Sequence, residues 1–276
     1  MIKPFPKPLP PRPKIERLPK RKRMTIAIGI KAQDGLVVGA DSEESTGFLK
    51  STQQKLLPLF IGMQLGSDGH PPTGVCVFTG AGDGGYIDAI TEELMEVMFD
   101  QTLQGVAVKK ALGKRLKEFY KENVIPFGAF PENDRPSMEL LIAVQKVQGA
   151  LYVTDRTTIR SAMPYCAVGI GRTFAKNILD VLWRPSPAKQ IAALAVYVLG
   201  MVKENIEGCG KFSSVMILHD WMMQDNPNAP GSMLVPPPQT ATHLSGQEIA
   251  DLETAFSNEY ARAERDLIWD FISRHS

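Results

Sequence analysis

The sequence has few cysteines, few histidines and no long apolar run, and these shortages exclude several classes of protein. Its 276 residues contain 3 cysteines that lie far apart without CxxC spacing, which argues against a disulfide framework and a cysteine metal site. The 4 histidines are scattered without an HExxH motif, so no zinc centre is expected. No stretch approaches the roughly 20 apolar residues that a membrane-spanning helix needs. We therefore expect a cytoplasmic protein without a membrane partner, metal or other cofactor.

The chain also lacks a large net charge, because its 31 basic and 30 acidic side chains nearly cancel. The charge is nevertheless unevenly distributed. Residues 1–23 contain nine Lys or Arg and one acid, Glu16, which leaves a net charge of −7 for the rest. Seven of the 21 prolines lie there too, and proline fixes φ and lacks a backbone donor, so this segment should be extended. It has no apolar core of a secretory signal. Either it contacts an acidic partner, nucleic acid or its own acidic body, or it has no partner.

The body of the chain begins with a predicted β-hairpin. Residues 25–31 place an isoleucine at every second position, which is the period of a strand with one strongly apolar face. A turn at Gln33-Asp34-Gly35 leads into a second apolar run that ends at Asp41. This hairpin would bring Thr25 opposite roughly residues 41–44, so that a hydroxyl and a carboxylate meet at one end.

Further segments follow strand and helix patterns in blocks. Ser186 is expected to be a helix N-cap, with Pro187 as the first helical residue. Strands are expected at 55–60, 75–79, 138–144, 151–154 and 213–218, and helices at 87–98, 108–119, 173–182 and after 187. This order predicts an α+β protein with helices packed on sheets rather than alternating βαβ units.

Four segments are expected along the chain. They are a basic, proline-rich leader at 1–24, a globular domain at 25–222, a proline-rich linker at 223–244 and a C-terminal helix at 245–276. Ser245 and Glu248 form a capping box at the start of that helix. Its apolar stripe, from Ile249 to Phe271, either packs on the body of its own chain or binds a partner.

Two possible motifs, a hydrolase triad and a dinucleotide-binding loop, are disfavoured by the residues around them. His219, Asp220 and Ser213 or Ser214 could form a hydrolase triad, but these neighbours on one strand cannot all converge. Residues 80–85 match GxGxxG between a strand and a helix, a pattern typical of dinucleotide binding. Asp83 would place negative charge where the phosphates bind, and the flanking order is not βαβ. A tight strand-to-helix turn with Asp83 at the helix cap is therefore favoured over nucleotide binding.

The opening of the body resembles that of proteasome β-subunits and the related bacterial peptidase subunit, which are N-terminal nucleophile hydrolases. The resemblance is carried by residues 25–31, 34–41, Gly47 and 54–58, and continues through 79–81, 139–143, 151–152, 167–171 and 214–218. It covers roughly residues 25–222. It implies a proteasome-like four-layer αββα sandwich, with two antiparallel sheets flanked by helices, in a homo-oligomer such as a ring.

The resemblance also implies a catalytic arrangement for a threonine peptidase or amidohydrolase. Thr25 would be the nucleophile, with its own free α-amino group, of ordinary pKa about 7.7 to 8.0, as the base. Lys55 would hold down the pKa of that amine, and Asp41 would orient Lys55. The backbone N–H of Gly80 would line the oxyanion hole. By position in the family, the substrate pocket for a peptide or amide would include Glu44 and Phe78.

The sequence departs from the family pattern at several positions. Lys55 lies two residues closer to Thr25 than is usual. Ile170 stands where a serine is common, and Asn205 and Gly208 replace an aspartate and a serine that support the catalytic amine. Glu43 stands where a basic residue is common. These departures keep open an alternative, in which the chain is a catalytically silent assembly or binding module.

The leader bears directly on the activity. Residues 1–24 would acylate the amine of Thr25, so an active form requires their absence. Either a propeptide is removed between Met24 and Thr25, or translation begins at Met24 and the methionine is trimmed.

Overall fold

The computed structural model describes residues 25–41, 43–46, 49–52, 55–62, 72–100, 102–129, 136–207, 209–210, 212–225, 232–235 and 239–258. Of residues 43–46, 49–52, 222–225 and 232–235 only the backbone is described. The leader 1–24, Gly47, Gly208 and the C-terminal helix beyond 258 lie outside the described residues, so the expectations for them stay predictions.

Two five-stranded antiparallel sheets form the centre of the molecule. The first has the order β10 (Tyr165–Gly169), β1 (Ile26–Lys31), β2 (Gly35–Asp41), β11 (Ser213–His219), β14 (Ala241–His243). The second has the order β5 (Leu57–Ile61), β6 (Gly74–Gly82), β7 (Met138–Gln145), β8 (Gly149–Asp155), β9 (Thr158–Ala162). All neighbouring strands run antiparallel. The predicted α+β class is thus confirmed.

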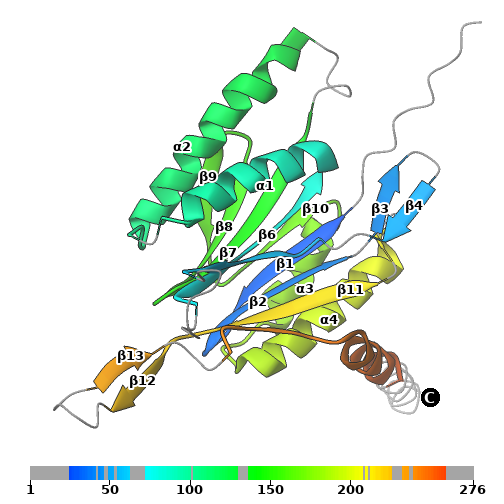
Figure 1. Cartoon of the computed structure of the whole chain (residues 1–276). Helices are drawn as coiled ribbons and strands as arrows, with labels where there is room; N and C mark the ends of the chain where they lie inside the picture. Colours follow the sequence, from blue (N-terminus) through cyan, green and yellow to red (C-terminus); the bar gives the residue numbers. More distant parts are fainter. Residues whose placement is uncertain are drawn as a thin grey trace, which may run out of the picture.

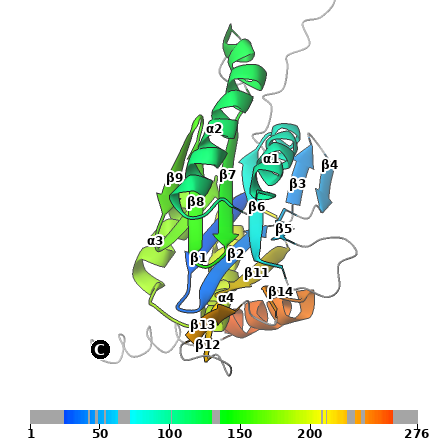
Figure 2. The same cartoon turned by 60° about the vertical axis from the view of Figure 1, so that its left-hand side comes forward.

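Helices cover the outer face of each sheet, which completes the predicted four layers (Figures 1 and 2). Helices α1 (Gly84–Met98) and α2 (Val106–Asn123) pack on the β5–β9 sheet, and a short 3₁₀ helix, η1 (Ile125–Ala129), follows α2. Helices α3 (Arg172–Leu182) and α4 (Ala188–Asn205) pack on the other sheet. Two separate hairpins are formed by β3 (Glu43–Thr46) with β4 (Leu49–Thr52) and by β12 (Met222–Asp225) with β13 (Ser232–Val235).

Strand β1 shows how alternation along the sequence builds these layers. Ile26, Ile28 and Ile30 are fully buried against α3 and α4, whereas Ala27 faces the second sheet. A Cβ on Gly29 would lie 3.0 Å from Cδ2 of Leu151. Small residues on this face of β1 therefore allow the two sheets to approach closely.

The predicted hairpin and its register are confirmed, since Ala27 pairs with Ala40 in an antiparallel ladder. The expected N-cap of α4 is wrong. Pro187 occupies the N-cap position and no side chain of the flanking segment caps the helix. Instead, Asp34 in the β1–β2 turn accepts a hydrogen bond from the amide of Ala188 at 2.6 Å. A long-range contact thus replaces the local cap.

The glycine-rich segment 80–85 forms the expected turn between β6 and α1. Gly82 has φ +124°, and a Cβ there would lie 2.1 Å from the carbonyl oxygen of Ser137. Asp83 is the N-cap residue of α1, but its carboxylate accepts from the amide of Ser137 at 3.0 Å rather than from the helix. Because β6 lies between two antiparallel neighbours, this is not the parallel βαβ unit of a dinucleotide-binding fold.

Residues 223–244, expected to be a linker, include strands. Strand β14 adds a fifth strand to the first sheet by pairing with β11, and part of the β12–β13 hairpin also lies in this range. The proline-rich composition concealed this short edge strand, because three residues carry no usable alternation. None of the described helices is both long and apolar enough to cross a membrane.

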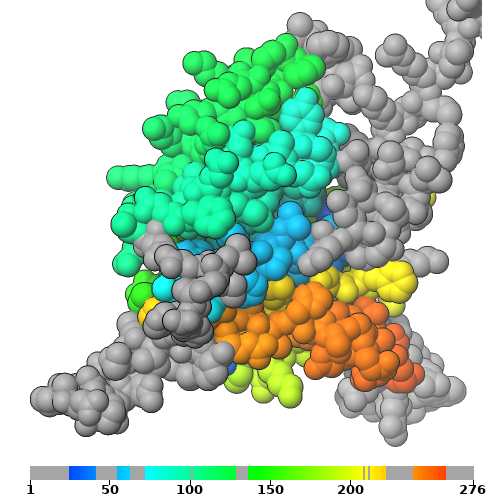
Figure 3. Space-filling view, viewed as in Figure 1, coloured from blue at the N-terminus to red at the C-terminus, as the bar shows by residue number. Residues whose placement is uncertain are grey.

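Helix 246–258 begins with the predicted capping box. The amide of Glu248 donates to Oγ of Ser245 at 3.2 Å, and the amide of Ser245 donates to Oε2 of Glu248 at 2.7 Å. The helix packs on the body of the chain (Figure 3). The rings of Phe256 and Tyr197 lie 5.3 Å apart, and Ile249 is buried. For its described part, the intramolecular alternative is therefore the one observed.

Candidate active site

The ends of three segments bring Thr25, Asp41 and Lys55 together. Thr25 precedes β1, Asp41 ends β2 and Lys55 precedes β5. Nζ of Lys55 donates hydrogen bonds to Oγ1 of Thr25 at 2.9 Å and to Oδ1 of Asp41 at 2.8 Å. Side chains expected to share one corner of the stacked sheets do lie within hydrogen-bonding distance.

The carboxylate of Asp41 is completely buried, so its charge requires partners. It receives Nζ of Lys55, the amide of Ile26 at 3.3 Å and the amide of Gly210 at 2.6 Å. These donors compensate the buried charge and fix the carboxylate. The carboxylate in turn holds Lys55 against the hydroxyl of Thr25.

The main chain of Thr25 is held by the turn that follows β10. The amide of Ile170 donates to the carbonyl oxygen of Thr25 at 3.0 Å. Gly169 has φ +94°, and a Cβ on it would lie 1.9 Å from that same oxygen. Only glycine fits this close approach, so the turn determines where the candidate nucleophile lies.

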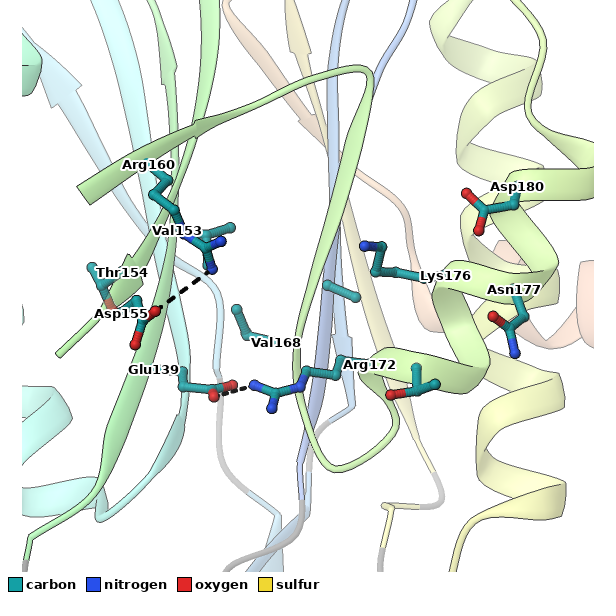
Figure 4. A pocket seen from close by; sticks show the side chains of 12 residues that line it. Glu139, Val153, Thr154, Asp155, Arg160, Val168, Arg172, Lys176, Asn177 and Asp180 are labelled. Atoms are coloured by element: carbon teal, nitrogen blue, oxygen red, sulfur yellow. Dashed lines mark hydrogen bonds and ion pairs between the residues drawn. The ribbon is translucent and has the colours of Figure 1, made fainter. Parts of the chain in front are cut away.

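Glu139 holds this turn from the second sheet, although the sequence led to no expectation of a role for it. Its Oε2 accepts a hydrogen bond from the amide of Gly169 at 3.1 Å, and its Oε1 forms an ion pair with Arg172 at the start of α3 (Figure 4). A single acid at the start of the otherwise apolar strand 138–144 was the available signal. Its partners are 30 or more residues away and become visible only in the fold.

The remaining predicted site residues lie on β6 or in β3. Gly80 pairs with Leu140, and the next residue, Ala81, lies beside Gly169, with its Cβ 3.1 Å from a Cβ built there. The end of β6 therefore adjoins the turn that holds Thr25, and the oxyanion role of Gly80 stays a prediction. The backbone of Glu44 is described, but its side chain is not, so its role also stays a prediction.

Phe78 does not line an accessible pocket. Its side chain is 0% exposed and belongs to the core between the β5–β9 sheet and helices α1 and α2. Even-numbered positions around it on β6 face these helices, because Cys76 lies in the same core whereas Val75 and Val77 face the other sheet.

Two of the positions that depart from the family pattern, Ile170 and Asn205, contribute no carboxylate or hydroxyl. Ile170 presents an apolar side chain that is half exposed. Nδ2 of Asn205 donates to the carbonyl oxygen of Met201 in its own helix, at 2.8 Å. Neither side chain therefore replaces the lost support for the amine of Thr25.

The serine, histidine and aspartate that are neighbours in the sequence each form a hydrogen bond with a different residue, so they do not form a triad. His219 contacts Oγ1 of Thr242 at 2.8 Å, and Asp220 accepts from Gln145 at 2.8 Å. Ser214 is hydrogen bonded to another histidine, His243 of β14, at 2.8 Å. Because His243 lies in the segment expected to be a linker, nothing in the sequence pattern predicts this pair.

Two of the three cysteine thiols, Cys76 and Cys166, are unsuited to nucleophilic or metal-binding roles. Burial raises the pKa of the Cys166 thiol to about 12, and burial raises the pKa of the Cys76 thiol still further. Both therefore stay protonated at neutral pH and are poor nucleophiles and metal ligands. Among the described residues, no three His, Cys, Asp or Glu side chains form a group that could hold a metal ion.

No protein-family model and no curated protein sequence matches the chain. Solved structures do match. Anbu from Yersinia bercovieri, described as an ancestral β-subunit, is 17% identical over 87% of this chain and 97% of its own, with a TM-score of 0.64. Anbu from Hyphomicrobium sp. strain MC1 is 15% identical over 87% and 97%, with a TM-score of 0.62. A helical assembly of the Anbu complex from Pseudomonas aeruginosa is 15% identical over 89% and 96%, with a TM-score of 0.62. These matches show that the chain has a proteasome-like fold.

Proposed function

We propose that this chain is a proteasome β-like threonine hydrolase, which cleaves a peptide or amide bond with Thr25 as nucleophile once residues 1–24 are absent. The observation that carries the proposal is the position of Nζ of Lys55, 2.9 Å from Oγ1 of Thr25 and 2.8 Å from Oδ1 of Asp41. A solvated lysine or an isolated edge threonine would not be held in this way.

In this mechanism, the free amine of Thr25 accepts the proton of its own hydroxyl while Oγ1 attacks the carbonyl carbon. The N–H of Gly80 donates to the developing oxyanion. When the C–N bond breaks, the leaving amine takes the proton from the ammonium, and an ester to Thr25 remains. Water then adds to the ester carbonyl and gives a proton to the amine. As the bond between the carbonyl carbon and Oγ1 breaks, the ammonium returns a proton to Oγ1, which releases the acid and restores Thr25.

The ammonium of Lys55 has two roles. It stabilises negative charge on Oγ1 as the hydroxyl loses its proton. It also disfavours a second cation nearby, which keeps the amine of Thr25 neutral and able to accept a proton. Asp41 keeps Lys55 in place without contacting the hydroxyl itself.

The N-terminus of natively expressed protein tests the first requirement. Intact-mass measurement and N-terminal sequencing should find a form that begins at Thr25. A chain that always retains residues 1–24 would contradict the proposal, because the nitrogen of Thr25 would then be an amide without basicity.

Covalent labelling tests the nucleophile. A peptide epoxyketone, which reacts with both the hydroxyl and the amine of an N-terminal threonine, should label the processed chain at Thr25. Thr25→Ala should abolish the adduct, Thr25→Ser should retain it, and the exposed Thr158→Ala serves as the matched control.

A silent assembly or binding module is the second candidate. The half-exposed apolar Ile170 and the helix-bonded Asn205 favour it, since the amine lacks their usual polar support. Correctly processed protein that forms no adduct would support this candidate. A reducing, cytoplasmic location and an acidic partner for the basic leader fit either function.

We also infer self-association, because a matched neighbour is described as a helical assembly. Light scattering of the purified full-length chain should give a mass several times that of one chain. A monomer at all concentrations up to about 100 µM would contradict it, since Kd would then exceed roughly that value.

A further inference from the structure

A pocket of about 460 Å³ lies between strands β8 and β9 of one sheet, β10 of the other and helix α3 (Figure 4). Its apolar lining consists of Val153, Ala167 and Val168, of which the last two are buried. Its size falls in the range of sites for small ligands, about 300 to 1,000 Å³.

Charged side chains of opposite balance line the two sides of this pocket. The sheet side carries two acids and one base, Glu139, Asp155 and Arg160. The α3 side carries two bases and one acid, Arg172, Lys176 and Asp180. The pocket is therefore neutral in sum but dipolar, negative towards the sheet and positive towards the helix.

Some of these charges are already engaged with each other. Glu139 pairs with Arg172 across one end of the pocket, and Asp180 accepts a hydrogen bond from the hydroxyl of Tyr165. Arg160 and Asp155 lie 4.0 Å apart, which is a loose pair between two exposed side chains. An exposed pair of this kind contributes little to stability, so a ligand can replace it at little cost.

Lys176 differs from the other cations of the pocket. It points from α3 towards the pocket in Figure 4, and no hydrogen bond or ion pair joins it to the described residues. A cation on the helix side and a loosely held carboxylate, Asp155, on the sheet side thus remain for a ligand, with the apolar surface between them.

We propose that this pocket binds short peptides by their two charged ends, with the carboxylate at Lys176 and the ammonium at Asp155. Both contacts are charge-assisted hydrogen bonds. A zwitterion compensates both groups at once. A ligand with one blocked end leaves either Lys176 without a ligand carboxylate or Asp155 with only its loose pair to Arg160. The side chains of the peptide would lie over Val153, which is partly exposed.

This inference deepens the proposed function, on which its biological meaning rests, because a peptidase releases fragments with free ends. The pocket adjoins the candidate active site through Glu139, which lines it and also accepts the amide of Gly169 beside Thr25. A bound fragment would be separated from Thr25 by Glu139 and the turn at Gly169.

The test uses the full-length Thr25→Ala chain, so that binding is measured without turnover. Isothermal titration with trialanine should show binding. Its N-acetylated and its C-amidated forms should each bind at least tenfold more weakly. Lys176→Ala should remove the preference for a free carboxylate, and Asp155→Asn the preference for a free amine. Lys176→Arg should restore binding.

The exposed Lys114→Ala on α2 is the matched control and should bind trialanine like the parent. No binding of trialanine, equal binding of its N-acetylated and C-amidated forms, or unchanged affinity in both Lys176→Ala and Asp155→Asn would overturn the proposal. Because the measurement needs no nucleophile, its failure is distinguishable from a failure of epoxyketone labelling at Thr25.

Discussion

Gly169 approaches Thr25 so closely that a Cβ on the glycine would lie 1.9 Å from the carbonyl oxygen of the threonine. Residues 144 positions apart in the sequence thus fix each other, since Ile26 and Gly169 pair across β1 and β10. The candidate nucleophile is placed by its main chain as well as by the hydrogen bond from Lys55.

Gly169→Ala should lower the free energy of unfolding by about 3 kcal/mol, because it adds the strain of φ +94° and a clash with the oxygen of Thr25. Urea denaturation of the full-length chain measures it. The control is Gly113→Ala in α2, where a Cβ meets nothing within 4 Å. That variant should be about 0.5 to 1 kcal/mol more stable than the parent. Equal effects in both variants would contradict the close contact.

Lys55→Met should destabilise the chain by about 3 to 5 kcal/mol, because it leaves the buried carboxylate of Asp41 without its countercharge. Asp41→Asn combined with Lys55→Met should recover part of this loss, since no buried charge then remains. Urea midpoints of the two single variants and the double variant form the thermodynamic cycle. A double variant with purely additive losses would show that the pair is not coupled.

Glu139→Ala should loosen the turn at 169–171 and slow labelling of Thr25, because the amide of Gly169 loses its charged acceptor. A hydrogen bond to a charged group contributes about 1.5 to 3 kcal/mol, so we expect amide exchange there to rise about tenfold or more. Hydrogen-exchange mass spectrometry measures this without any activity. Glu139→Gln keeps an acceptor, so its amide exchange rate should lie between those of the parent and Glu139→Ala. The exposed Glu204→Ala should exchange like the parent.

Asp34→Ala should cost about 0.5 to 2 kcal/mol, because Asp34 is the side chain that caps the amide of Ala188 at the start of α4. Ser186→Ala should change the free energy of unfolding by less than about 0.5 kcal/mol. Thermal or urea unfolding of the pair distinguishes the long-range cap from the local one. The reverse order of effects would restore Ser186 as the cap.

The contact between Asp34 and Ala188 shows which parts of the fold the sequence could predict and which it could not. The hairpin at 25–41 and the order of helices followed from periodicity, because each depends on which residues share a face. The cap at Ala188 did not, because Asp34 is 154 residues away and reaches α4 only after the sheet forms. The prediction of a linker at β14 was wrong for a related reason. Pairing with β11 stabilises this strand, while its own composition resembles that of a loop.

The candidate site divides in the same way. The family resemblance predicted that Thr25, Asp41 and Lys55 lie together, and their hydrogen bonds agree with that prediction. Phe78 was assigned to the pocket by position alone, whereas strand alternation turns it into the core below α1 and α2. Glu139 lies in a segment that shares the resemblance, but no role was expected for it, since its role depends on the contact between the turn at Gly169 and the opposite sheet.

The stability of the chain should also respond to pH through Asp220. Burial raises the pKa of the Asp220 carboxyl above its ordinary value of 3.8, and the hydrogen bond from Gln145 and the charge of Lys31 offset only part of this. The native state therefore binds this proton more tightly than the unfolded chain does. Its contribution to stability falls as pH rises from 3.8 through the raised pKa, and the full cost is present above it.

Asp220→Asn removes the buried charge while its amide oxygen can still accept the hydrogen bond from Gln145. The variant should unfold at a higher urea concentration than the parent at pH 7, and this advantage should shrink as pH is lowered below 3.8, where the parent carboxyl is protonated in both states. The exposed Asp251→Asn on helix 246–258 is the control and should differ from the parent by less than about 0.5 kcal/mol at pH 7. If Asp220→Asn were less stable than the parent at pH 7, the ionised carboxylate and its bond to Gln145 would be net stabilising, and the assigned direction of the pKa shift would be wrong.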